Sequence, residues 1–272
     1  MKQFIKKHWS AIILASSFVL GLSLLLYPTV ANWWNSREAR KLINSYDTIV
    51  EEIKTEDSDR MLEDAELYNE LLLQEPNRYF PSPKLHDRYE NTLNIDKNGM
   101  MGMISIPSLH LNMPIYHGTS DAVLASNIGH IEGTSLPAGQ KTNHTVLSGH
   151  RGLPSAKLFT DIDRMVEGDV FMLKILGKTF TYEVDQIRIV LPEEMDSLEI
   201  EPGKDYVTLV TCTPYGINTH RLLVRGKRIA NLPDEYLNTG QDAVVINRNI
   251  TAVVFSFIIL TLILIWCLLR YR

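Results

Sequence analysis

The sequence predicts a mainly β protein, built as a closed barrel that follows an N-terminal helical segment and is flanked by two membrane-spanning helices. Three observations lead to this prediction. Two long stretches near the ends carry no charge, apolar residues early in the chain recur at helical spacing, and the later part alternates short β-branched runs with turn residues. With 272 residues, 45% of them hydrophobic, and a net charge of −5, the chain has room for one sizeable domain and these additional segments.

The charge-free stretches have the length of membrane spans. One runs from Ser10 to Ser36 and includes the apolar segment Ala11–Tyr27 followed by Trp33 and Trp34, and the other covers Ile250–Leu269. Basic residues precede the first span and follow the second. Because positive charge favours the cytoplasmic side of a membrane, both termini are expected in the cytoplasm and the domain outside the cell membrane. A cleaved signal peptide is the competing interpretation of the N-terminus, and the length of the apolar segment argues against it.

Helical spacing follows the first span. Ser36 is a plausible N-cap, Asp57-Ser58-Asp59 marks a break, and a second helix follows, so the segment is either a helical hairpin or one long helix with a break. The apolar residues that share a face are Leu42, Ile43, Tyr46, Ile49, Val50 and Ile53 in the first part, and Met61, Ala65, Tyr68 and Leu72 in the second. This segment leads from the membrane to the main domain.

Residues 76–98 have no regular period and are interpreted as a loop. Prolines and aromatic residues are frequent there, including Tyr79, Phe80 and Tyr89. Long loops without secondary structure are uncommon in compact domains and often act as lids or binding segments. We therefore treat this segment as a candidate lid.

Short strands with turn residues between them dominate the rest of the domain. The expected strands are Met103–Ile106, Leu111–Ile115, Thr145–Ser148, Val170–Leu173, Thr179–Ile187, Val207–Cys212 and Leu222–Ile229. One helix is expected among them, capped by Ser155, closed by Gly168, and carrying Leu158, Phe159, Ile162, Met165 and Val166. Seven or eight short strands indicate a sandwich or a barrel, and we favour the barrel because closure removes exposed edges.

The expected organisation is then a series of eight segments. They are a cytoplasmic N-terminus (1–9), a membrane anchor (10–31), the helical segment (32–75), the candidate lid (76–98), the β-barrel (99–230), a linker (231–249), the second membrane helix (250–269) and a cytoplasmic tail (270–272). The mild negative charge gives no reason to expect nucleic acid as a partner, since that would call for a basic patch.

Cys212 is the first candidate for chemistry. The only other cysteine, Cys267, lies in the second expected span near the inner face, so the two cannot pair, and an unpaired thiol outside the cell is a candidate nucleophile. A free thiol is mostly protonated at neutral pH and needs a base or a cation beside it. His150 in "VLSGHRG" follows a strand between two glycines, and Arg221 follows Cys212 across a turn through Pro214-Tyr215-Gly216.

Other roles for these residues are open at this point. His150 and Arg221 could be surface residues, and His220 is read as structural because it faces away from Arg221 on a strand. The remaining barrel histidines, His117, His130 and His144, are loop residues or hydrogen-bonded supports. A zinc site normally shows paired ligands at short spacing, and this sequence has none. In a papain-like protease the cysteine comes before the histidine in the chain, which is the reverse of the order here. No metal and no cofactor are expected.

Several stretches resemble the sortase family. "TLVTC" (Thr208–Cys212) is similar to its TLxTC signature, with "SGH" (Ser148–His150) at the histidine and Arg221 in the following strand. Longer stretches, "MPIYHGTS", "GHIEGTSLPAG", "LSGHRGLPSAKLFTD" and "TCTPYGINTHRLLVRG", are similar to class C sortases, the branch that polymerises pilins. The resemblance covers about Gly99 to Ile229 and the two-span topology.

The resemblance implies an eight-stranded barrel and a transpeptidase. Cys212 would attack an LPxTG-like sorting signal and form a thioester, His150 would act as acid and base, Arg221 would stabilise the oxyanion, and Thr211 is a candidate substrate-binding residue. The accepting amine would be a lysine of the next pilin subunit. The loop at Leu191–Tyr206 would help to hold the signal.

One departure and two alternatives accompany this prediction. Class C sortases commonly cover the site with a lid bearing Asp-Pro and an aromatic residue, and this chain has no Asp-Pro. The alternatives are a sortase that anchors proteins to a cell-wall precursor, and a non-catalytic membrane scaffold. Intact His150 and Arg221 argue against the scaffold.

Overall fold

The computed structural model describes residues 2–232, except for the side chains of residues 2–8, 10–12 and 15. The predicted second membrane helix, the tail and nearly all of the predicted linker therefore lie outside the described residues, as does Cys267. Within the part so described, no helix combines the length and the apolar character that a bilayer crossing needs.

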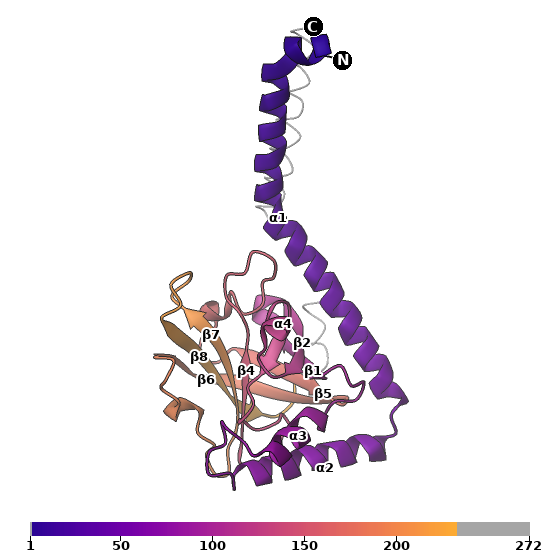
Figure 1. Cartoon of the computed structure of the whole chain (residues 1–272). Coiled ribbons are helices and arrows are strands. Elements are labelled where there is room, and N and C mark those ends of the chain that lie inside the picture. Colours follow the sequence, from indigo (N-terminus) through magenta and orange to yellow (C-terminus); the bar gives the residue numbers. More distant parts are fainter. Residues whose placement is uncertain (1, 233–272) are drawn as a thin grey trace.

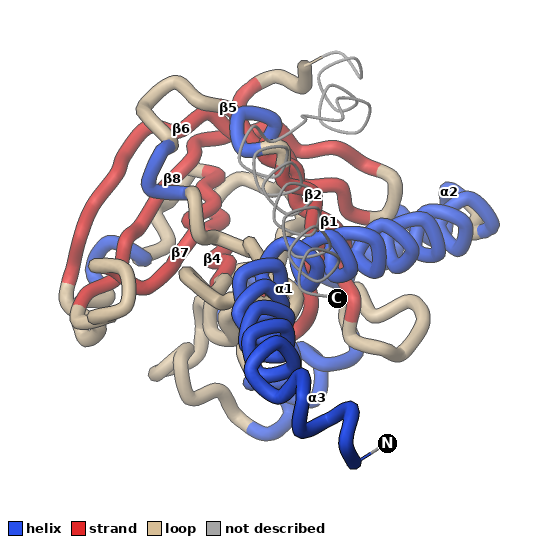
Figure 2. Tube along the Cα trace, turned by 90° about the horizontal axis from the view of Figure 1, so that it is seen from above, coloured by secondary structure: helices blue, strands red, loops and turns tan. Residues whose placement is uncertain are grey.

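The domain is a closed barrel of eight strands with the order β1-β2-β3-β4-β7-β8-β6-β5 (Figures 1 and 2), as predicted. The strands are β1 Met100–Ile106, β2 Leu111–His117, β3 Ile128–His130, β4 Asn143–Ser148, β5 Val170–Ile175, β6 Lys178–Val190, β7 Asp205–Thr213 and β8 His220–Ile229. Seven of them were predicted, with ends that differ by up to three residues. The strand that was not predicted is β3, whose three residues are too few to show alternation.

The helices are α1 Lys2–Glu52, α2 Thr55–Leu72, α3 Pro83–Asn91 and the short α4 Asp121–Leu124, with single 3₁₀ turns at Pro107–Leu109, Ile162–Arg164 and Asp196–Leu198. Figure 1 shows that the first part of α1 projects away from the barrel, whereas its second part runs alongside. In the same view α2 and α3 lie across the end of the barrel that is remote from the projecting part.

The face of α1 that was predicted to be buried does pack on the barrel. Ile43 and Tyr46 are buried against Met100 and Met103 of β1. The Tyr46 hydroxyl donates to the Met101 carbonyl at 3.0 Å and accepts from the Leu176 amide at 3.0 Å, so its polar atom is satisfied inside the core. Burial raises the pKa of the Tyr46 phenol.

The predicted start of that helix is wrong. Ser36 is no N-cap, because α1 is continuous through it from the region of the predicted anchor. The predicted break does occur, at Ile53–Lys54, and α2 begins at Thr55, which places Asp57 in its first turn rather than before it. An acidic side chain in the first turn stabilises a helix start. Because acidic residues also occur as N-caps, the sequence pattern placed the start of α2 at Asp57, two residues after its actual start.

The prediction that residues 76–98 lack secondary structure is also wrong, because α3 lies within them. Pro83 occupies the first turn, and Leu85 and Tyr89, four positions apart, are both buried. Tyr89 is a core residue with no exposed surface, and its hydroxyl receives the Gly118 amide at 2.8 Å and contacts His130 Nδ1 at 3.0 Å. It is therefore not available to cover an active site.

The expected helix between Ser155 and Gly168 is absent, and turns with one 3₁₀ turn take its place. Leu158 has a φ of 38°, outside the helical region, so a continuous helix cannot pass through it. Phe159 and Ile162 are nevertheless fully buried. The apolar spacing that suggested a helix is produced by a compact loop that fits its side chains into the mouth of the barrel.

Two histidines are buried as neutral rings. His130 has its ring nitrogens near Tyr89 and the Ser135 carbonyl, and His144 lies between the Glu199 carbonyl and the Thr208 hydroxyl. Burial lowers the pKa of His130 to about 3 and that of His144 to about 4. Both belong to the structural supports that the sequence suggested.

The free energy of unfolding should fall as the pH falls below about 6.5. There the unfolded chain takes up protons on these two histidines, with an ordinary pKa of about 6.5, while the folded state does not until the pH approaches 4 and 3. Each site contributes up to about 1.4 kcal/mol per pH unit in that window. Denaturant unfolding at pH 7, 6 and 5 would measure the slope, and His144→Gln should reduce it while exposed His110→Gln should not. Equal stability at pH 7 and pH 5 would contradict the prediction.

Candidate active site

Cys212 lies one residue before the end of β7 and is a free, partly accessible thiol. Alternation along the strand puts it on the same face as Thr208 and Val210, whereas Leu209 and Thr211 face the other way. Leu209 belongs to the main core, so Cys212 is on the outer face of the barrel wall. The β7–β8 turn beside it, orange in Figure 1, lies at the end of the barrel nearest the projecting part of α1.

His150 reaches the level of Cys212 from the neighbouring strand. β4 and β7 are parallel with Ser148 opposite Val210, and the Gly149 amide donates to the Val210 carbonyl at 3.1 Å. β4 ends at Ser148, and continuing its register brings His150, two residues further on, level with Cys212, two residues after Val210. Gly149 permits this close passage, because a Cβ there would lie 2.8 Å from Ile128 and Phe159.

Arg221 is the direct partner of Cys212 in the antiparallel β7–β8 pair, so the two side chains lie on the same face. Its Nη1 donates to the carbonyl oxygens of Asn218 at 3.2 Å and His220 at 3.1 Å, which fixes the guanidinium to the β7–β8 turn. His220 pairs with Thr213 in the next register position and faces away, as predicted. Strand pairing thus places Arg221 directly opposite Cys212, and the loop that carries His150 leaves the adjacent strand β4. The catalytic roles of the three residues stay a prediction.

Thr211 has a different environment from those three residues. Its side chain is only 2% exposed, and its hydroxyl donates to the Gly149 carbonyl at 2.8 Å. This bond ties the residue before His150 to the strand of Cys212. The predicted contact between Thr211 and substrate stays a prediction.

Arg151 is a site residue that sequence reasoning missed. Its Nη1 donates to the Thr213 hydroxyl at 3.2 Å, its Nη2 pairs with Asp163, and its guanidinium stacks over Tyr215. Arg151 follows His150 and Thr213 follows Cys212, so this contact joins the loop after β4 to the end of β7. No periodic signal could have revealed it, because Arg151 lies in an irregular loop.

An apolar floor leads along the wall to Cys212. Val146 of β4, Val210 of β7 and Leu223 of β8 form a buried cluster with Leu198, and Ile131, Val190 and Met195 pack around it. Leu198 and Met195 belong to the segment between β6 and β7, the one that the sequence pointed to as a cradle. The cluster is on the face of Cys212, and its four core members are at most 7% exposed because the segment between β6 and β7 packs over the strands.

Arg78 bridges the two sides of this floor at the end remote from Cys212. Its guanidinium donates to the Leu198 carbonyl at 3.1 Å and the Gly133 carbonyl at 3.4 Å, and it pairs with Glu199 at 3.2 Å. The chain passes tightly over Gly133, where a Cβ would lie 2.5 Å from the Arg78 carbonyl oxygen. Of the other two aromatic residues offered as covers, Tyr79 is half-buried beside Arg78 and Phe80 is 81% exposed.

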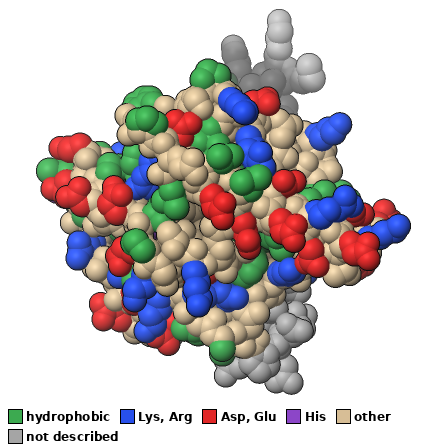
Figure 3. Space-filling view, turned by 90° about the horizontal axis from the view of Figure 1, so that it is seen from below, with side chains coloured by type: hydrophobic (Ala, Val, Ile, Leu, Met, Phe, Trp, Pro, Cys, Tyr) green, Lys and Arg blue, Asp and Glu red, His purple; other side chains and the backbone are tan. Residues whose placement is uncertain are grey.

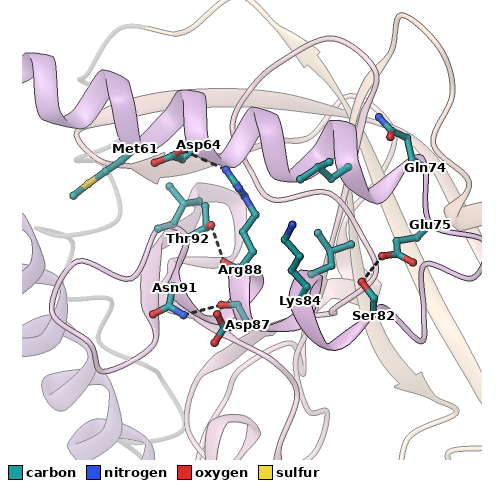
Figure 4. Close-up of a pocket in the computed structure, with 13 residues that line it drawn as sticks. Met61, Asp64, Gln74, Glu75, Ser82, Lys84, Asp87, Arg88, Asn91 and Thr92 are labelled. Atoms are coloured by element: carbon teal, nitrogen blue, oxygen red, sulfur yellow. Dashed lines mark hydrogen bonds and ion pairs between the residues drawn. The ribbon is translucent and has the colours of Figure 1, made fainter.

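A large pocket lies elsewhere, between α2 and α3 (Figure 4). It has a volume of about 800 Å³, and side chains of both signs line it, among them Asp64, Lys84, Asp87 and Arg88. Acidic and basic side chains are likewise interspersed over the surface on that side of the molecule (Figure 3). None of the three site residues lines this pocket, so size alone does not identify the active site.

The fold is a closed eight-stranded barrel with a cysteine, a histidine and an arginine at or just beyond the ends of adjacent strands. This combination is typical of a β-barrel enzyme with a cysteine nucleophile. The family model for the sortase domain matches residues 104–229. Sortase C1 from Streptococcus agalactiae has a similar solved structure, with 47% identity and a TM-score of 0.68 over 71% of this chain and 100% of that chain. Sortase C from Clostridium perfringens, solved with the C-terminal cell wall sorting motif, has 43% identity and a TM-score of 0.62 over the same shares.

Curated relatives agree with this result. Sortase A from Streptococcus agalactiae is 32% identical over 118 residues, which are 42% of this chain and 47% of that protein. The chain thus spans about half the length of that relative. The chain belongs to the sortase family, a family of cysteine transpeptidases.

Proposed function

We propose that this protein is a class C type transpeptidase that cleaves an LPxTG-like sorting signal and joins it to a lysine amine of a pilin subunit, so that pili are polymerised. The observation that carries the proposal is the pairing of Arg221 opposite Cys212, with the loop of His150 leaving the adjacent strand β4, on the face that holds the apolar floor. The similarity to the sortase C structures, one of them solved with a sorting motif, supports the choice of substrate.

The reaction follows from the chemistry of the three side chains. The Cys212 thiolate attacks the carbonyl carbon of the Thr–Gly bond, and Arg221 stabilises the resulting oxyanion. The C–N bond breaks as His150 gives a proton to the leaving glycine amine, which leaves a thioester on Cys212. A lysine amine then attacks the thioester, His150 takes its proton, and the thiolate is released with a new isopeptide bond.

Arg221→Lys should lower the rate of sorting-peptide cleavage by about 10²- to 10³-fold, the usual cost of removing one oxyanion donor. Lysine keeps the charge but loses the planar fork that the turn carbonyls of Asn218 and His220 hold in place. Steady-state cleavage of a fluorogenic LPxTG peptide would measure the loss. Arg60→Lys, at an exposed arginine of α2 away from the site, is the matched control. Equal rates for wild type and Arg221→Lys would remove Arg221 from the proposed mechanism.

Polymerisation is tested by mixing the full chain in detergent with candidate pilins and following ladders that resist sodium dodecyl sulfate. We expect ladders that require both the sorting signal of the pilin and its acceptor lysine. The alternative function, anchoring of surface proteins to a cell-wall precursor, predicts peptide cleavage and capture of a precursor amine without ladders. That outcome would reject pilus polymerisation and keep the transpeptidase.

We also propose that the protein is attached to the cell membrane with its barrel outside the cell and both termini inside. The support is the pair of charge-free stretches, 10–36 and 250–269, with basic residues toward the chain ends. Large apolar side chains of α1 are also exposed between Trp9 and Trp34, for example Leu24 at 70%. Extraction of cell membranes with alkaline carbonate should leave the protein in the pellet.

We further propose that the segment around Arg78 acts as a lid over the far end of the apolar floor. Arg78→Ala should raise the rates of Cys212 alkylation and sorting-peptide hydrolysis about five- to tenfold, since it removes charge-assisted hydrogen bonds to Leu198 and Gly133. Replacing the whole of 76–98 would be a poor test, because Tyr89 is in the core. Arg60→Ala on α2 is the control, and unchanged rates in Arg78→Ala would contradict a lid.

A further inference from the structure

A small polar pocket lies where α1 meets the barrel. Its volume is about 270 Å³, and its walls come from α1, from the start of β2 and from the loop at 156–158. Two hydrogen bonds join these walls. The side-chain Nδ2 of Asn35 donates to the Ser155 carbonyl at 2.7 Å, and the backbone amide of Lys157 donates to Asn32 Oδ1 at 2.9 Å.

The pocket is lined by hydrogen-bond donors and by positive charge. Its polar residues include Asn32, Asn35, Arg40, His110, Asn112 and Lys157, and no Asp or Glu lines it among the described residues. In a protein with 32 acidic and 27 basic residues, such a lining is selective for an anion. The pocket between α2 and α3, by contrast, includes three carboxylates.

The charges are available to a ligand to different degrees. Lys157 Nζ is shared with Asp161 at 2.8 Å and the Leu109 carbonyl at 3.4 Å. Arg40 is exposed, and within the described part of the chain no carboxylate pairs with its guanidinium. Arg40 is therefore the principal free donor, and its planar fork matches two oxygens of one phosphate.

The pocket is next to exposed apolar side chains of α1. Trp33 and Trp34, which are 53% and 59% exposed, follow Asn32 directly on α1, and the exposed apolar side chains of the projecting part precede it. Tryptophan favours the interface between lipid tails and headgroups. If that part of α1 is in the bilayer, the pocket opens at the depth of the phosphates.

We propose that this pocket binds the phosphodiester headgroup of an anionic membrane lipid, with Arg40 and Lys157 on the phosphate and the asparagine amides on the remaining oxygens. The inference rests on the proposed membrane attachment. Its consequence is positional. The wall at Ser155–Lys157 belongs to the loop that begins with His150, so a bound headgroup holds the active-site end of the barrel against the membrane.

Native mass spectrometry of the full chain in detergent tests the proposal, with phosphatidylglycerol and phosphatidylcholine as probes. We expect one retained phosphatidylglycerol, and Arg40→Gln or Lys157→Gln should each weaken its apparent affinity about tenfold, the size of one charge-assisted hydrogen bond. Arg40→Lys should restore part of the affinity. Lys41→Gln is the matched control, because Lys41 is the next residue on α1 but pairs with Glu38 outside the pocket. Circular dichroism and thermal unfolding of each variant verify its fold.

Three outcomes would overturn the proposal. They are equal retention by wild type and both glutamine variants, equal retention of the two lipids, and displacement of the lipid by inorganic phosphate at similar concentration, which would indicate a soluble anion instead. Carbonate extraction and peptide cleavage are measured on the same variants. Failure of membrane attachment or of catalysis is thereby distinguished from failure of the lipid site.

Discussion

Replacing Cys212 with alanine will abolish thioester formation and sorting-peptide cleavage, a loss on the order of 10⁴- to 10⁶-fold. No other described side chain on that face of β7 can act as the nucleophile, since Val210 is apolar and Thr208 is buried against His144. Intact-protein mass spectrometry would detect the acyl adduct directly in wild type under acid quench.

The second cysteine provides the control for this prediction. Cys267→Ala, which removes the only other thiol of the chain, should form the adduct at the wild-type rate. Cleavage retained by Cys212→Ala, or lost equally in Cys267→Ala, would contradict the assignment of the nucleophile and with it the proposed mechanism.

The second large effect is expected at His150, where His150→Gln should lower the rate of cleavage by about 10²- to 10⁴-fold, the range of general acid–base catalysis. The leaving glycine amine would lose its proton donor, and the lysine amine its proton acceptor. Glutamine keeps hydrogen-bonding capacity but cannot transfer a proton at neutral pH. Single-turnover cleavage and the pH dependence of the rate would measure the effect.

His220→Gln is the matched control for His150→Gln, because His220 is one register position from Arg221 and faces away from Cys212. We expect its cleavage rate to stay near that of wild type. Alkylation of Cys212 by a thiol reagent should also depend on His150 and not on His220. Equal losses in the two variants would mean that His150 acts only through the stability of the fold.

Local sequence signals predicted most of the elements. Alternation at Phe180, Tyr182 and Val184 identified β6, and the helical spacing of Ile43, Tyr46 and their neighbours identified the face of α1 that packs on the barrel. These predictions succeeded because the pattern extended over several residues with one buried side. The three-residue β3 offers no such pattern and was missed.

The wrong predictions have different causes. The loop at 155–168 has helical spacing, but the positive φ of Leu158 and the need to bury Phe159 produce turns instead. Residues 76–98 carry a short helix signal at Pro83, Leu85 and Tyr89 that the surrounding prolines obscured. In the loop at 155–168, contacts with distant parts of the barrel outweighed local preference, whereas in residues 76–98 the local preference was present and was not recognised.

The sequence by itself singled out the candidate residues for the chemistry, because a lone thiol, a histidine between glycines and a following arginine were distinguishable by type and position. Only the tertiary structure decided how they meet. The parallel pairing of β4 with β7 makes His150 level with Cys212, the antiparallel pairing of β7 with β8 sets Arg221 opposite, and Arg151 fastens the arrangement from behind. Strand register and loop contacts depend on packing between residues far apart in the chain, and no local pattern encodes them.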